Sequence, residues 1–414
     1  MRVTNSMLVN NFMRNLNTNL TRMDSLQNML ATGRKFAHIS DDPTALIYSQ
    51  AARNKLARLS HYERTVASAQ DWLTQVESGV MELQKVMADA YVATIDAATD
   101  VKGTDEKETE RTSDKIAISR TIEQLRNHFV DTLNTTFGDK YIFGGYNTPG
   151  EPADVQYTDM ITGPFTVDKD EDGNLILLFN GYDLSYFDGK SREEFAEIEA
   201  IELETYPHPG GAPGATIDLS SLTIYDFQDP DFDFNALGLD QAQWDALTED
   251  DELEAKLMMD MLELLRRDVL TFDVGPSISM PVTISGIDLI LYDTVDKDGV
   301  AVKRNMFNVL NDLYTVTSNG EPAEVINKFI KPLQDGQNHL LTKTAEVGGR
   351  TRRLELLAAR YEQDYINYER MKSDAEDVDF AEVIMFQKMA EAVYQAALSS
   401  GARIIQPTLM DFLR

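Results

Sequence analysis

The pattern most suggestive of metal chemistry in this sequence is the acidic run Asp168-Lys-Asp-Glu-Asp-Gly173. Acids at the first, third and fifth positions, followed by glycine at the sixth, are typical of the start of an EF-hand calcium loop. The twelfth position is Phe179, so the bidentate carboxylate that completes such a loop is missing. We favour a hairpin turn leading into a strand at Asn174–Phe179. Whether calcium binds through Asp168, Asp170 and Asp172 stays open.

Other catalytic patterns are missing from the sequence. The histidines are dispersed and form no His-Glu-x-x-His motif, at His38, His61, His128, His208 and His339. There is no glycine-rich phosphate loop and no Gly-x-Ser-x-Gly elbow, and the absence of cysteine excludes thiolate chemistry and disulfides. We therefore expect no enzymatic activity, no cofactor and no catalytic or metal-binding residues.

Composition limits the classes of partner. A chain of 414 residues exceeds one ordinary core, so two or more domains are expected. Its net charge of -31 disfavours nucleic acid, which needs a basic face. No stretch offers about twenty uninterrupted apolar residues, so no membrane insertion is expected. The opening MRVTNSMLVNNFMRN is polar where a secretory signal would be apolar, so we expect no cleaved signal peptide.

The first segment has the spacing of a coiled-coil helix. Its apolar stripe, with one polar exception, is Val9, Met13, Leu16, Leu20, Met23, Gln27 and Leu30. Gln27 either fixes the register of a buried stripe or faces solvent. Asp42 can cap a second helix that starts at Pro43, whose stripe is Leu56, Leu59, Tyr62, Val66, Ala69, Leu73, Val76, Val80, Leu83 and Met87. A third helical pattern from Ile118 to Phe137 is expected to fold back along the second.

The periodicity changes after Tyr141. Short apolar runs at Asn174–Phe179, Ala215–Tyr225 and Ser277–Tyr292 are separated by turn residues, which predicts an acidic β-rich insert. The insert holds at least one helix, because a helical stripe follows the capping residues Thr248 to Asp251, at Leu253, Leu257, Met261, Leu264 and Leu265.

Helical periodicity returns near Phe307 and continues to the C-terminus. One stripe consists of Val347, Thr351, Leu354, Ala358, Tyr361, Tyr365, Tyr368, Lys372 and Ala375. The last helix has the stripe Val383, Phe386, Ala390, Val393, Ala397, Ser400 and Ile404. The fold class is therefore mainly α: a long antiparallel helical bundle or coiled coil of N- and C-terminal segments, with an inserted β-rich, α+β domain.

Both terminal helices carry apolar residues beside their stripes, at Met7, Leu26, Met29, Met385, Met389, Leu398 and Ile405. A single partner helix cannot bury several sides at once, which indicates lateral packing against further copies or subunits. The alternative, burial within the chain's own helical domain, is the more common situation for a helical protein.

Four stretches of the sequence resemble those of a known family, and this resemblance favours packing against further copies or subunits. They are the opening MRVTNSMLVNNFMRNLNTNL, the segment LQNMLATGRKFAHISDDPTAL, the run YIFGGYNT and the closing GARIIQPTLMDFLR. The chain resembles the flagellin superfamily of axial proteins, and VGGRTRRLE matches its Val-Gly-x-Arg run. The closing stretch is more similar to the junction proteins between hook and filament than to filament flagellins. Thr408-Leu409-Met410 departs conservatively from their usual Ser-Leu-Leu.

The resemblance implies a self-assembling structural subunit of the bacterial flagellum that adapts hook to filament. The implied partners are a ring of copies, the other junction protein, flagellin, an export chaperone and the type III export apparatus. The implied location is extracellular. The alternatives are a filament flagellin, an axial protein with an enzymatic or calcium-binding insert, and a cytosolic coiled-coil adaptor.

We expect five segments: the inner assembly helices at 1–42 and 377–414, the rod at 43–140 and 303–376, and the outer insert at 141–302. The predicted assembly interface consists of Leu16, Leu20, Met23, Leu30, Phe386, Val393, Ile404, Ile405, Leu409, Phe412 and Leu413.

Overall fold

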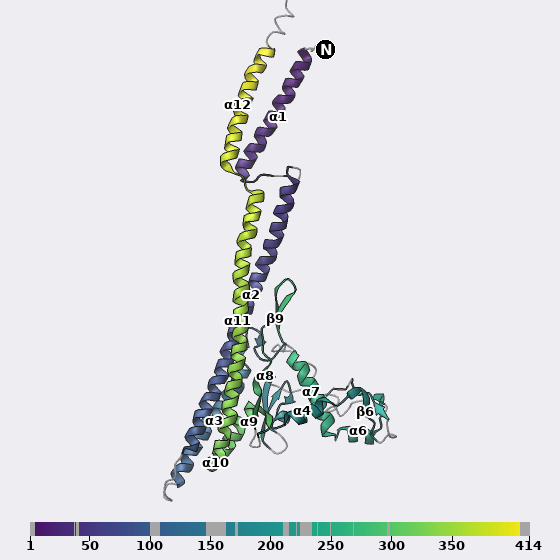
Figure 1. The fold of residues 1–414 in the computed structure, drawn as a ribbon, viewed down its shortest axis with the longest axis vertical. Coiled ribbons are helices and arrows are strands. Elements are labelled where there is room, and N and C mark those ends of the chain that lie inside the picture. The colour runs from purple at the N-terminus through teal and green to yellow at the C-terminus, as the bar shows by residue number, and fades with distance from the viewer. Residues whose placement is uncertain are drawn as a thin grey trace, which may run out of the picture. The chain divides into compact units, whose positions relative to one another are not determined.

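A computed structural model describes residues 5–36, 38, 41–99, 108–145, 163–169, 173–209, 215–220, 222–223, 234–237, 239–248, 250–267, 269–295 and 299–405. The chain folds into two compact units. The first, which we call the terminal unit, combines residues 1–64 with 357–414. The second, the central unit, comprises residues 65–356. The predicted fold class, mainly helical with small sheets in an insert, is confirmed (Figure 1).

Four helices contribute to the terminal unit. They are α1 (Asn5–Thr32), the first part of α2 (Pro43–Ala98), the last part of α11 (Ile330–Glu376) and α12 (Phe380–Ile405). α1 and α12 lie side by side, drawn in purple and yellow in Figure 1. They run antiparallel, since Phe12 near the start of α1 meets Gly401 near the end of α12. The start of α2 packs antiparallel on α11, where Tyr62 stacks on Tyr361 at 6.1 Å between ring centroids.

The burial along α1 corrects the predicted register. Val9, Leu16, Met23 and Leu30 are half-buried as expected, but the positions between them that turn inward are Phe12, Asn19 and Leu26. The predicted Met13, Leu20 and Gln27 are exposed instead. The row Val9, Leu16, Met23 and Leu30 is common to the predicted and the observed stripe. Because α1 is apolar on both sides of this row, the sequence could not show which side meets α12. Gln27 faces solvent and does not fix a buried register.

The register of α12 also departs from the prediction after Ala390. Tyr394 and Gly401 turn inward, whereas Val393 and Ser400 are exposed. The inward positions are Val383, Phe386, Ala390, Tyr394, Ala397 and Gly401. This spacing is closer to 3.6 than to 3.5 residues per turn, as expected for a helix that does not supercoil strongly.

In the central unit the predicted helices form a core around α2. Its predicted stripe is buried in this unit from Val66 to Met87. Asp42 Oδ1 accepts from the Thr44 and Ala45 amides at 3.0 Å, so the predicted cap at Pro43 is confirmed.

The other helices of this core are α3 (Glu108–Leu133), α9 (Met306–Ser318), α10 (Ala323–Ile326), the 3-10 turn η5 (Asn327–Phe329) and the first part of α11. α3 ends at Leu133, and Phe137 lies in a short strand.

The insert combines short strands with helices. Its three-stranded sheet consists of β3 (Phe165–Lys169), β4 (Leu175–Phe179) and β5 (Tyr182–Asp183). The two-stranded antiparallel sheets pair β1 (Thr136–Phe137) with β2 (Lys140–Tyr141), β6 (Tyr206–Pro207) with β7 (Thr216–Ile217), β8 (Thr271–Gly275) with β9 (Ile278–Pro281), and β10 (Leu291–Val295) with β11 (Ala301–Asn305). The insert helices are η2 (Ser185–Phe187), α4 (Arg192–Glu199), η3 (Leu203–Thr205), η4 (Phe234–Leu237), α6 (Gln241–Thr248), α7 (Asp251–Arg267) and α8 (Gly286–Ile290).

Three expectations for the insert are tested by these elements. The strand expected at Asn174–Phe179 is β4, paired with β3 from Lys169↔Leu175 to Phe165↔Phe179, and the helix expected after Thr248 is α7. The run Ser277–Tyr292 is not a single strand, because α8 interrupts it. Gly286 at the start of α8 allows the Phe165 ring to approach closely, since a Cβ atom there would lie 2.1 Å from Phe165 Cζ. The proposed division into five segments stays a prediction.

Candidate assembly surface and polar junction

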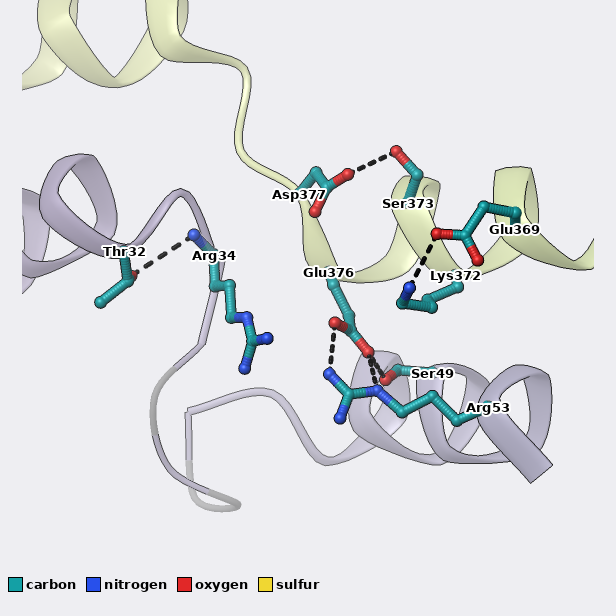
Figure 2. Close-up of polar contacts among 9 residues, drawn as sticks. All are labelled: Thr32, Arg34, Ser49, Arg53, Glu369, Lys372, Ser373, Glu376 and Asp377. Carbon is teal, nitrogen blue, oxygen red and sulfur yellow. Dashed lines mark hydrogen bonds and ion pairs between the residues drawn. The ribbon is translucent and has the colours of Figure 1, made fainter. Parts of the chain in front are cut away.

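The two linkers of the terminal unit lie against each other. Residues 33–42 connect α1 to α2, and residues 377–379 connect α11 to α12. Arg34 and Asp377 form an antiparallel bridge, and the Val378 amide donates to the Gly33 carbonyl at 3.1 Å. Gly33 adopts φ +70°, a left-handed conformation that glycine reaches without strain. The linkers therefore pair through their backbones where both chain segments change direction (Figure 2).

A buried carboxylate anchors this junction. The Glu376 side chain is only 3% exposed, and both of its oxygens accept from Arg53: Nε donates to Oε1 and Nη2 to Oε2, each at 2.6 Å. Ser49 Oγ donates a further hydrogen bond to Oε1. Bidentate arginine pairing is strong and fixes the orientation of both groups. Figure 2 shows Ser49 and Arg53, both from α2, pointing at Glu376.

These contacts lower the pKa of Glu376 to about 2. The main cause is the hydrogen bonding from Arg53, which favours the ionised form, and Ser49 acts in the same direction. Burial opposes both, because it disfavours charge. The carboxylate is therefore ionised at neutral pH, and its charge is satisfied by α2.

Lys35 caps the end of α11 from the other segment. The last carbonyls of a helix have no partner within that helix. Here the Lys35 backbone amide donates to the Glu376 carbonyl at 2.7 Å, and Lys35 Nζ donates to the Asp374 carbonyl at 2.6 Å. A cation at this position also complements the negative end of the helix dipole.

The terminal helix pair has a small apolar core of its own. Leu26 of α1 packs with Val378 and Val383, and the surrounding residues are Met29, Leu30, Phe386 and Ala390. At the other end of the pair, α12 approaches Phe12 so closely that only glycine fits at position 401. A Cβ atom there would lie 2.2 Å from Phe12 Cζ.

Gly401→Ala is expected to weaken the pairing of α1 with α12 by about 1–2 kcal/mol, because the Phe12 ring must move away. In a Phe12→Ala background the same change should instead stabilise α12 by up to about 1 kcal/mol, the usual helix preference for alanine over glycine. Amide exchange of α12 in this double-mutant cycle measures the difference. Additive effects would show that the ring and the glycine are not in contact.

The outer sides of the pair are apolar but uncovered. Of the 24 large apolar side chains exposed among the described residues, 14 lie in the terminal unit. On α12 they occur on both flanks of the inward face: Met385, Met389 and Val393 on one, and Phe380, Ile384 and Leu398 on the other. Met13 and Leu20 form the matching outer stripe of α1. Contiguous exposed apolar stripes of this kind mark interaction surfaces.

The predicted interface residues fall into three groups. Leu16, Met23, Leu30 and Phe386 are half-buried, and the last two pack on the core of the pair. Leu20 is 36% exposed and Val393 is 48% exposed, so they lie on the outer stripes. Ile404 and Ile405 end α12, although their side chains lie outside the described residues, as do Leu409, Phe412 and Leu413 altogether. The assignment of these residues to an assembly interface stays a prediction.

The sequence did not indicate the polar junction. Glu376 stands in an acidic run with Asp374, Asp377 and Asp379, a pattern typical of a solvated surface, and Arg53 is 323 residues away. The sequence feature that could have indicated the junction is the interruption of the helical pattern in the N-terminal and in the C-terminal segment, at similar distances from the two chain ends.

The described residues contain no group of three or more side chains that could hold a metal ion. Of the three acids for which the sequence leaves calcium binding open, Asp170 and Asp172 lie outside the described residues, and Asp168 lies on β3. Within the described part of the chain, every helix is too short or too polar to cross a bilayer.

Comparison with known proteins gives matches to flagellar proteins. Residues 3–148 match the bacterial flagellin N-terminal helical region. Flagellar hook-associated protein 3 of Escherichia coli (strain K12) is 21% identical over 206 residues, which cover 50% of this chain and 62% of that protein.

Among solved structures, the flagellar junction protein FlgL from Legionella pneumophila aligns with a TM-score of 0.45 and 10% identity, covering 80% of this chain and 100% of that one. Xanthomonas campestris FlgL aligns with a TM-score of 0.45 and 10% identity, covering 78% and 99%. The family model and the curated relative confirm the resemblance found in the sequence: residues 3–148 match the N-terminal helical region of bacterial flagellins, and the chain is similar to flagellar hook-associated protein 3.

Proposed function

We propose that this chain is a structural subunit of the bacterial flagellum that self-assembles at the junction between hook and filament. The observation that carries the proposal is the set of uncovered apolar stripes on the terminal helices, two on α12 and one on α1. An isolated pair of helices buries one face of each helix, so stripes on the other sides require further helices. Neighbouring copies supply them, and α1 and α12 would line the inner part of a ring.

The distribution of charge supports packing through the terminal unit. This unit has 15 basic and 14 acidic side chains and is nearly neutral, whereas the central unit has 23 basic and 55 acidic side chains. Copies of a neutral unit can pack closely without repulsion, but copies of a strongly acidic one repel each other. We infer that the terminal units form the contact between copies and that the acidic insert projects into solvent.

The remaining partners that we propose are those that the sequence resemblance implies. The subunit ring would contact a second junction protein on the hook side and flagellin on the filament side. Delivery would use the type III export apparatus with its chaperone, which places the protein outside the cell. No catalytic activity is proposed.

Deletion of residues 401–414 is expected to abolish incorporation, because it removes the close contact of Gly401 with Phe12 and the apolar tail. The cells should be non-motile and shed unassembled flagellin into the medium. Glu197→Lys on α4, an exposed charge change in the insert, is the matched control and should leave swimming unchanged. Normal swimming of the truncated form would contradict the proposal.

Immunogold labelling tests the position within the flagellum. Label confined to the distal end of the hook supports the junction. Label along the whole filament would identify the chain as a flagellin instead.

A further inference from the structure

The break between α11 and α12 has no helix-breaking residue. Only Asp377, Val378 and Asp379 separate the two helices, and no glycine or proline occurs from residue 350 to residue 400. By contrast, α11 continues through Gly348 and Gly349, where the sequence favours a break. The end of α11 at Glu376 therefore has no glycine or proline stop signal of its own.

The corresponding break in the N-terminal segment is intrinsic. Gly33 adopts a positive φ directly after α1, and Asp42 caps α2 in front of Pro43. Glycine after a helix and proline at the first position of the next are standard stop and start signals. The bend in the N-terminal segment is therefore encoded by its own residues and does not require contacts with the C-terminal segment.

The contacts that hold the C-terminal break come mainly from the N-terminal segment. Lys35 binds the last carbonyls of α11, Gly33 accepts the Val378 amide, and Arg53 with Ser49 holds Glu376. Val378 is 8% exposed and packs on Leu26. The start of α12 also has local support: Asp379 Oδ1 accepts from the Ala381 and Glu382 amides, and Val378 shares a buried cluster with Val383 in the first turn.

We propose that residues 330–405 are a single helix-forming segment, which the docked N-terminal segment divides into α11 and α12. When residues 33–35 are released, Asp377 to Asp379 join the helix, because three additional helical residues restore the backbone hydrogen bonds that now go to the linker. The terminal unit then has two forms, a broken form when the linkers are paired and a continuous helix when they are not. This inference concerns the folded chain alone and does not depend on the proposed function.

The test follows Val378 by NMR in the full-length chain labelled at the valine Cα. Val347 in α11 and Val383 in α12 are internal references for helical valine. The release variant Lys35→Ala/Arg53→Gln removes two contacts of the N-terminal segment, and Arg58→Gln, exposed on the same helix, is the control. We expect the Val378 resonance to be extended in the wild type and control, and to move to the helical range in the release variant.

Phe380→Pro provides the reverse experiment. Proline at the first position of α12 is compatible with the broken form, but it drives the preceding Asp379 out of the helical conformation. Added to the release variant, it should return Val378 to the extended range. A second release variant, Leu26→Asp, expels α1 without touching the polar contacts. An extended or random-coil Val378 in both release variants would overturn the proposal.

Discussion

Arg53→Ala is expected to destabilise the terminal unit by about 2–3 kcal/mol at pH 7. The change leaves the Glu376 carboxylate buried without its bidentate partner, and removal of one member of a buried ion pair commonly costs about 3–5 kcal/mol. The lower figure applies because the Arg53 side chain is 42% exposed, so water can reach the vacated position. Native-state amide exchange of Val378 and Val383 measures the local free energy of opening directly.

The destabilisation caused by Arg53→Ala is expected to depend on pH. In the wild type the pKa of Glu376 falls from its ordinary 4.5 to about 2, so the folded unit binds this proton more weakly than the unfolded chain. The ionised carboxylate therefore stabilises the unit fully above about pH 4.5, and this contribution is lost as the pH falls towards 2. Without Arg53, burial dominates and raises the pKa of Glu376, so the penalty should be largest at neutral pH and shrink in acid.

Two controls isolate the ion pair. Glu376→Gln should remove the acid-dependent part of the stability while keeping most of the side-chain volume. Arg58→Ala, on an exposed part of the same helix, should change the opening free energy by less than about 0.5 kcal/mol. An Arg53→Ala penalty that does not vary with pH would contradict the assignment of the effect to Glu376.

The long helices could be predicted from the sequence because their information is local and repeated. The stripe from Val66 to Met87 contains an apolar residue at every position of one helical repeat, which identifies a buried face, and Trp72 and Val86 extend the burial beside it. Asp42 followed by Pro43 similarly specifies the start of α2 without reference to the rest of the chain.

The registers of the terminal helices and the polar junction could not be predicted in this way. Met13 and Leu20 are as apolar as Phe12 and Leu26, so the choice of inward flank depends on where α12 lies. Glu376 is charged, and only its distant partner Arg53 makes its burial possible. In the insert, the helix α8 interrupts an apolar run that resembles a strand, and Gly286 at its start lies against the Phe165 ring. Each of these features is decided by contacts between residues far apart in the sequence.

Leu26→Asp and Leu20→Asp are expected to fail at different stages of assembly. Leu26 is 8% exposed in the core of the pair, so an aspartate there loses the packing and buries a charge without a partner. The pairing of α1 with α12 should be destabilised by about 3–5 kcal/mol, and amide exchange in both helices should become fast in the isolated protein.

Leu20 lies on the outer stripe of α1, where the isolated protein tolerates a charge. Leu20→Asp should therefore change the exchange of α1 by less than about 0.5 kcal/mol and still prevent incorporation, because in the assembly this stripe is covered by a neighbouring copy. The comparison separates the two roles of α1, which are pairing with α12 and contact with a neighbouring copy. A variant that keeps the pairing with α12 but does not assemble must act through a surface that is exposed in the monomer. If Leu20→Asp assembles and swims normally, the outer stripe of α1 is not covered, and the contact between copies must be assigned to α12 alone.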